Sequence, residues 1–199
     1  MKAINSSRQK IVENIRKAAV AGGINHAMPR FSLIDKESES KEELYERFSQ
    51  SLKTAGAGVV PLDVSELEGY LKENFPEVID FRESSVWERY KGMKPLEMEA
   101  ETESVLLFGK MGVAENGAIW VDETCFPARL LPFIAGKLVL LVDGKKIVRD
   151  MHAAYAAIDG KLQGFGVFIS GPSKTADIEQ SLVYGAHGAI SLDVVILRG

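Results

Sequence analysis

The chain has 199 residues, of which 46% are hydrophobic and 26% charged, and its formal net charge is -4 at pH 7. These values are ordinary for a soluble globular protein, and the slightly acidic balance argues against nucleic acid as the main partner. A single cysteine, Cys125, excludes an intrachain disulfide and any iron–sulfur or zinc cluster held by cysteines of this chain alone.

The start of the chain is polar. Residues 1–8 lack the apolar core of a secretory signal peptide. No stretch approaches the roughly 20 apolar residues that a membrane-spanning helix needs. We therefore expect no membrane span and a cytoplasmic location, where a free cysteine stays reduced.

Two amphipathic helices are predicted before the first strand. Ser6 and Ser40 each stand three residues before a Gln or Glu, the pattern of a helix capping box, and apolar residues follow each at helical spacing. The second helix ends at Gly56 or shortly after it. Because about fifteen mostly irregular residues join the helices, which is long for a compact domain, we expect residues 1–56 to form a helical arm. Such an arm offers a surface for homo-oligomer formation.

Strand and helix patterns then alternate to the end of the chain, which predicts a single α/β domain over residues 57–199. A strand, a helix and a strand within about 25 residues is the unit that builds parallel sheets, so we expect a mostly parallel sheet flanked by helices. Helices are predicted after Asp63, from Ser84, after Asp150 and from Ser173, and a glycine-punctuated loop over residues 109–117. The predicted strands are 58–62, 78–81, 104–108, 118–121, 137–142, 165–169 and 190–197.

The junction around Gly171 is the most distinctive stretch. A strand pattern is followed by a Gly-Pro turn and then by Ser173, Lys174 and Thr175 at the start of a helical pattern. The free amides and positive dipole of a helix start, beside two hydroxyls and a cation, predict a site for a small anion. The alternative is purely structural: a turn, a Ser or Thr helix cap, and the acidic residues Asp177 and Glu179 complementing the dipole.

Two further loop residues are candidates for acid–base or nucleophilic chemistry. In an α/β sheet a pocket is expected beyond the carboxyl ends of the strands, where the loops after Phe108 and Ile169 can meet. Glu115 is then a candidate general base or nucleophile and His187 an acid–base group near neutral pH. The alternative for His187 is a packing histidine. No ligand spacing surrounds the other two histidines, so no metal site is predicted.

The sequence Asn116-Gly117 also has two interpretations. In one, Asn116 supplies a hydrogen bond and Gly117 a close backbone contact to a bound substrate. In the other, the dipeptide forms the turn of a β-hairpin.

A family resemblance runs through these motifs. The string from Gly171 to Glu179, followed by Gly185-Ala186-His187-Gly188, resembles the signature of the LUD (lactate utilisation) domain family, in particular its small LutC/YkgG-type members. Ala114-Glu115-Asn116-Gly117 stands where that family carries an Ala-Glu-Thr-Gly-like loop. Asn116 replaces the usual Thr, which weakens any role that needs its hydroxyl.

The resemblance implies a fold like that of glucosamine-6-phosphate deaminase, ribose-5-phosphate isomerase and the CoA transferases (NagB/RpiA/CoA-transferase-like). It also implies an accessory subunit of cytoplasmic L-lactate oxidation to pyruvate, which binds a small anion and partner proteins that carry iron–sulfur clusters. No cofactor is then expected on this chain itself. The alternative is an independent small enzyme of this fold that acts on a sugar phosphate, a CoA thioester or a folate-like substrate.

Overall fold

The computed structural model describes residues 9–14, 17, 39–94, 97, 102–159, 164–176, 182–184 and 188–198. The chain divides into two compact units, Met1–Ser38 and Glu39–Gly199. In the first unit residues 9–14 are helical, in agreement with the helix predicted after Ser6. No helix among the described residues is long and apolar enough to cross a membrane.

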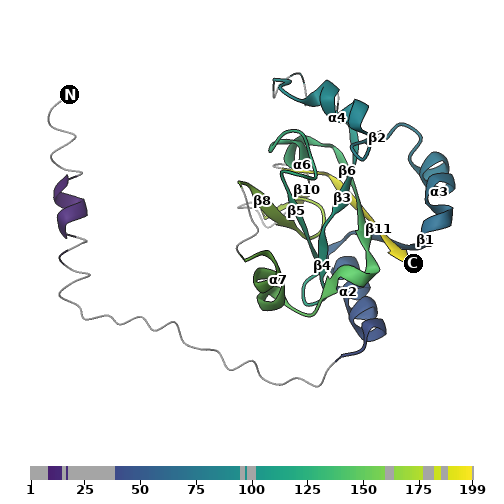
Figure 1. The fold of residues 1–199 in the computed structure, drawn as a ribbon, viewed down its shortest axis with the longest axis horizontal. Helices are drawn as coiled ribbons and strands as arrows, with labels where there is room; N and C mark the ends of the chain where they lie inside the picture. Colours follow the sequence, from purple (N-terminus) through teal and green to yellow (C-terminus); the bar gives the residue numbers. More distant parts are fainter. Residues whose placement is uncertain are drawn as a thin grey trace. The chain divides into compact units, whose positions relative to one another are not determined.

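The second unit is built on a five-stranded sheet in which every neighbouring pair of strands is parallel (Figure 1). The central strands are apolar and buried on both faces, as parallel sheets covered by helices require. Pro61, which cannot donate a ladder hydrogen bond, lies in an edge strand. The predicted α/β class is therefore confirmed. In spatial order the strands are β1 (Gly58–Asp63), β11 (Ser191–Arg198), β6 (Lys137–Asp143), β3 (Ser104–Gly109) and β2 (Ile79–Asp80).

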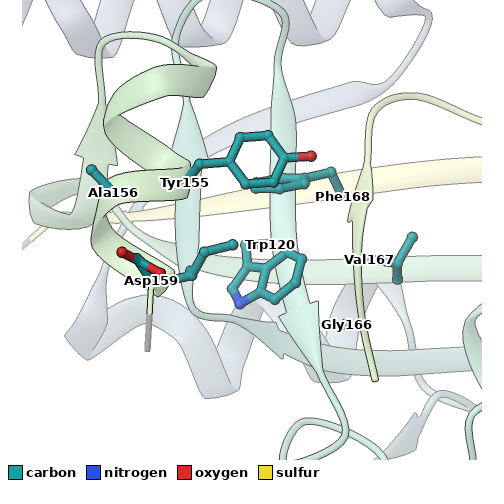
Figure 2. Close-up of a pocket in the computed structure, with 8 residues that line it drawn as sticks. Trp120, Tyr155, Ala156, Asp159, Gly166, Val167 and Phe168 are labelled. Carbon is teal, nitrogen blue, oxygen red and sulfur yellow. The ribbon is translucent and has the colours of Figure 1, made fainter. Parts of the chain in front are cut away.

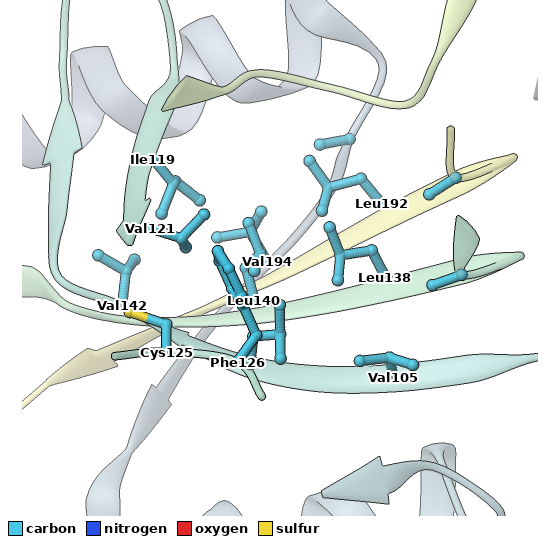
Figure 3. Close-up of a cluster of buried hydrophobic side chains, with 14 of the residues drawn as sticks. Val105, Ile119, Val121, Cys125, Phe126, Leu138, Leu140, Val142, Leu192 and Val194 are labelled. Carbon is cyan, nitrogen blue, oxygen red and sulfur yellow. The ribbon is translucent and has the colours of Figure 1, made fainter. Parts of the chain in front are cut away.

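The two faces of this sheet belong to different hydrophobic clusters, because successive side chains of a strand point to opposite sides. On one face, helix α3 (Leu67–Asn74) packs through Leu67 and Leu71 against residues such as Val139. The other face contributes Leu138, Leu140 and their neighbours to the main core (Figure 3). Three further helices are α4 (Ser84–Tyr90), α6 (Leu131–Ile134) and α7 (Met151–Ile158).

A second, four-stranded sheet covers the main core. Side chains of its antiparallel strand β5 (Ala118–Asp122) point alternately to its two faces: Ile119 and Val121 join the core, whereas Trp120 faces helix α7. The sequence patterns did not predict this sheet, because its strand β4 (Met111–Val113) lies inside the expected 109–117 loop. The glycine at 112 suggested a loop, but a Cβ there would lie 2.7 Å from the Phe48 ring, so Gly112 makes room for packing. In order the strands are β7 (Ile147–Val148), β4 (Met111–Val113), β5 (Ala118–Asp122) and β8 (Gly166–Ile169).

Helix α2 (Lys41–Ala55) begins and ends as its sequence predicts. The Glu43 N–H donates to Ser40 Oγ at 3.2 Å and the Ser40 N–H to Glu43 Oε2 at 2.8 Å, which completes the capping box. The bond from the Ser40 N–H, together with a 2.9 Å bond from the Ser40 hydroxyl to the same carboxylate oxygen, lowers the pKa of the Glu43 carboxyl. Gly56 ends the helix in the left-handed region with φ 89°.

The location of α2 differs from the expected arm of residues 1–56. Phe48 and Leu52 are fully buried in the main core, and α2 falls in the Glu39–Gly199 unit. The structure thus separates the units after Ser38 rather than after residue 56. Amphipathic spacing shows that a helix has an apolar face, but it does not show which surface that face contacts.

Candidate functional site

The two loops singled out in the sequence do meet. The Ser170 hydroxyl, just after β8, donates to the carbonyl oxygen of Asn116 at 2.7 Å. Both loops also press on the backbone of helix α2 through glycines. A Cβ on Gly117 would lie 2.7 Å from the Leu52 nitrogen, and one on Gly171 would collide with the Ala55 carbonyl oxygen. The convergence of these loops therefore anchors α2.

The helix predicted to start at Ser173 is wrong. Residues Lys174–Ala176 form strand β9, which pairs antiparallel with β10 (Leu182–Tyr184). Because Lys174–Ala176 form a strand, these three residues do not supply the helix dipole on which the predicted anion site was based. A Gly-Pro turn followed by Ser and Thr can precede either a helix or a strand, and here the pairing with β10 stabilises the strand.

Lys174 contacts a helix, but at the opposite end from the one expected. Its ammonium group donates a hydrogen bond to the carbonyl oxygen of Ala55, the last residue of α2. A cation at a helix C-terminus is favourable, because the unpaired carbonyl groups carry the negative end of the dipole. Lys174 thus stabilises α2.

Glu115 joins the β4–β5 hairpin to helix α7. Its carboxylate accepts a hydrogen bond of 3.0 Å from the N–H of Met151, the first residue of α7. Asp150 caps the same helix by accepting from the Ala153 N–H at 2.9 Å, and this bond, with one from Arg149, lowers the pKa of Asp150. A catalytic role for Glu115 stays a prediction.

The hairpin interpretation of Asn116-Gly117 is confirmed. Asn116 Oδ1 accepts from the Ala118 N–H at 3.0 Å, and the Gly117 N–H donates to the Val113 carbonyl oxygen at 2.9 Å. Gly117 has φ 69°, which favours glycine. Thr175 lies in β9, and His187, Asp177 and Glu179 lie outside the described residues.

A cavity of about 220 Å³ lies beside the loop after β8. Gly171 and Ser173 line it, together with apolar residues such as Leu138 and Leu192 near the amino ends of β6 and β11. It is therefore at the opposite edge of the sheet from the pocket that the topology predicts. Neither Glu115 nor Lys174 is among its described lining residues.

A larger cavity, of about 460 Å³, lies where the topology predicts one. We call it the carboxyl-edge cavity, because β2 and β3 end at it. Ligands of open α/β sheets bind outside the carboxyl ends of the strands. The sequence patterns missed its residues, although Arg82 and Thr124 each follow the end of a predicted strand within three residues. It is lined by Phe81, Arg82, Trp87, Phe108, Thr124 and Cys125.

Asp122 organises the polar side of this cavity. Its carboxylate accepts 2.7 Å hydrogen bonds from Lys110 Nζ and from the Thr124 hydroxyl, and a 2.9 Å bond from the Thr124 N–H. Burial alone would raise the pKa of Asp122, but these hydrogen bonds outweigh it and the pKa is lowered. Thr124 is thereby held at the cavity rim.

Arg82, a second polar residue of the carboxyl-edge cavity, is paired with two carboxylates. Arg82 donates from Nη2 to Asp80 at 2.6 Å and to Glu68 at 3.2 Å. Burial raises the pKa of the Cys125 thiol, so the thiol is protonated at neutral pH. The cavity thus combines three aromatic side chains with a hydroxyl and a guanidinium group, an arrangement suited to binding a ligand. Among the described residues, no three His, Cys, Asp or Glu side chains are grouped to hold a metal ion.

Removing the Asp122 charge is expected to cost about 1–2 kcal/mol of unfolding free energy at pH 7, because charge-assisted hydrogen bonds are lost. Since the folded-state pKa of Asp122 is lowered, this contribution is complete above the ordinary carboxyl pKa of about 4 and disappears as pH falls through the lowered value. Urea unfolding of wild type and Asp122→Asn from pH 7 to pH 2 measures it. The exposed Glu77→Gln variant is the control; a constant difference down to pH 2 would contradict the assignment.

The fold and cavities define an α/β protein with a parallel sheet and a ligand-sized cavity at its carboxyl edge. The model of the LUD domain matches residues 5–197, so the chain belongs to the LUD domain family. The resemblance stated from the sequence motifs is therefore confirmed.

Several relatives carry the name Lactate utilization protein C. The protein of that name from Anoxybacillus flavithermus is 25% identical over 156 residues, which are 78% of this chain and 70% of that protein. The one from Halalkalibacterium halodurans is 30% identical over 120 residues, 57% of this chain and 52% of that protein. This chain thus spans between about half and 70% of the length of these relatives.

A solved structure shares the fold. A DUF162 family protein from Deinococcus radiodurans matches with a TM-score of 0.64 and 16% identity, over 81% of this chain and 100% of that chain. This likeness supports the predicted α/β architecture.

Proposed function

We propose that this protein acts in L-lactate utilisation, as an accessory subunit that associates in the cytoplasm with iron–sulfur partner proteins. The observation that carries the proposal is the LUD domain match over residues 5–197, together with relatives named Lactate utilization protein C. The single cysteine supports an accessory role, because this chain alone cannot hold a cysteine-ligated cluster.

Two groups expected to bind a small anion, such as the carboxylate of lactate, are already hydrogen-bonded within the protein. The Ser173 N–H donates to the Ala189 carbonyl oxygen at 2.8 Å, and Lys174 bonds to helix α2. The Ser173 hydroxyl, at the 220 Å³ cavity, is the donor that we propose for this role.

Deleting the gene is expected to abolish or slow several-fold growth on L-lactate as the sole carbon source, while growth on glucose is unchanged. The reason is that loss of a required subunit stops lactate oxidation but not sugar catabolism. Growth curves of the deletion strain and of the strain complemented with a tagged chain measure this, and the tagged chain should copurify with iron–sulfur proteins. Unchanged growth on L-lactate together with no copurifying cluster protein would refute the proposal.

An independent enzyme is the second candidate, and the carboxyl-edge cavity favours it. Its volume of about 460 Å³ lies within the range of small-molecule sites. Glu115 and Lys174 contact different helices and are not among the described residues that line this cavity. Thermal-shift screening with sugar phosphates, CoA thioesters and folates, repeated on Thr124→Val, separates the candidates. A ligand-induced rise in Tm that this variant loses would support the enzyme.

A further inference from the structure

A third and larger cavity, an open groove of about 740 Å³, lies between helix α7 and strand β8. Figure 2 shows the aromatic side chains of Trp120, Tyr155 and Phe168 gathered in it, with Asp159 at its rim. The groove lies on the face of the second sheet that is turned away from the main core, since Ile119 and Val121 point to the core and Trp120 to α7. We call it the α7–β8 groove.

The three aromatic rings of this groove form a contiguous surface. The ring centroids of Trp120 and Phe168 are 4.7 Å apart, and those of Phe168 and Tyr155 are 5.6 Å apart. Trp120 is 5% exposed and forms the floor, whereas Tyr155 is 59% exposed and open to a partner. A Cβ on Gly166 would collide with the Trp120 indole, so the absence of a side chain there lets the ring lie on the strand.

The described residues that line the groove carry a negative charge, that of Asp159. Asp159 directly follows α7, and its N–H donates to the Tyr155 carbonyl oxygen at 2.9 Å, which ends the helix. The C-terminal carbonyl groups of a helix carry its negative end. None of the described lining residues is Lys or Arg. Aromatic faces beside a carboxylate and a helix C-terminus are complementary to an ammonium or guanidinium group.

Among the described residues, the strand beside the groove has a neighbouring strand on one side only. Within the described part of the chain, β8 pairs with β5 alone and stands at the end of its sheet. The Glu123 N–H donates to the Phe165 carbonyl oxygen at 3.1 Å. In an antiparallel pair every second residue directs its backbone N–H and C=O to the neighbouring strand, so Phe165, Val167 and Ile169 direct theirs to β5. The backbone groups of Gly166 and Phe168 therefore point to the open edge, where an extended segment can pair.

We infer that the α7–β8 groove binds an extended basic segment of a partner protein, which pairs with the edge of β8 and places a Lys or Arg side chain between Tyr155, Phe168 and Asp159. The occupant follows from charge complementarity and from the open strand edge. This interaction goes beyond the proposed role in lactate utilisation, and its test is independent of growth on lactate.

Fluorescence titration tests the inference on the full chain. The sequence has two tryptophans, so Trp87→Phe leaves Trp120 in the groove as the single reporter. The probe is the capped peptide Thr-Val-Lys-Val-Thr, and its matched control carries acetyl-lysine at the centre. We expect saturable quenching by the lysine peptide and affinity about 5- to 30-fold weaker for the acetylated one, since loss of the charge removes the cation–π and carboxylate contacts.

Two exposed positions supply the matched variants. Asp159→Asn and Tyr155→Leu are each expected to weaken lysine-peptide binding about three- to tenfold. Glu77→Gln, the same charge change on an exposed carboxylate outside the groove, is expected to leave it unchanged. Equal affinity for the two peptides, or no saturable quenching by either, would overturn the inference. If capped single lysine binds as tightly as the peptide, the strand pairing is overturned.

Discussion

The Phe48→Ala variant is expected to lose about 3–5 kcal/mol of unfolding free energy, the usual cost of deleting a fully buried aromatic side chain. Phe48 is fully buried in the main core with Val105 and Ile119, and its ring lies against the Gly112 backbone. A helix in a free arm would not show this loss, because its side chains would contact only another arm or solvent. Equilibrium unfolding in urea measures the difference.

The control is Glu46→Ala on the exposed side of the same helix. Its effect is expected to stay within about 0.5 kcal/mol, since it removes no buried contact. If Phe48→Ala were as mild as Glu46→Ala, helix α2 would not be part of the α/β core in solution. A large loss for Phe48→Ala alone fits the packing seen around Val105 and Ile119.

Gly117→Ala is expected to destabilise the protein by about 2–4 kcal/mol. Two costs combine: the φ of 69° is unfavourable for alanine, and the new Cβ would lie 2.7 Å from the Leu52 nitrogen and 2.9 Å from the Ser51 carbonyl carbon. Both atoms belong to the backbone of α2, so a side-chain rotation cannot relieve the collision. Thermal and urea unfolding measure the loss.

Gly69→Ala is the matched control. Gly69 lies inside helix α3, and a Cβ there would meet no atom within 4 Å. Alanine is therefore expected to stabilise the protein by about 0.5–1 kcal/mol, because it loses less backbone entropy in a helix. A decrease in unfolding free energy for Gly117→Ala and an increase for Gly69→Ala would support the close contact between the hairpin and α2. The same sign for both would contradict it.

These contacts show that loop residues within the family motifs have structural roles. Glu115 holds the start of α7, Lys174 holds the last residue of α2, and Gly117 lies against Ser51 and Leu52 of α2. Each of the three fixes a helix in place. Variants at these positions therefore need a stability measurement beside any functional assay, because loss of function can follow from loss of the fold.

The elements with local signals could be predicted from the sequence. The capping box at Ser40, the left-handed end at Gly56, the cap at Asp150 and the Asn116-Gly117 turn all depend on residues a few positions apart. Apolar runs such as β6 also identify buried parallel strands without knowledge of their neighbours. The LUD motifs led to the right family for the same reason, since they are short strings.

Which elements contact each other could not be predicted from the sequence, because it depends on the folded chain. The strand at Lys174–Ala176 forms because β10 pairs with it, and α2 joins the core because Gly112 and Gly117 leave room for its side chains and backbone. The carboxyl-edge cavity brings together ends of β2, β3 and β5 that are distant in sequence. Such contacts between segments far apart depend on shape and partner surfaces, which no local pattern records.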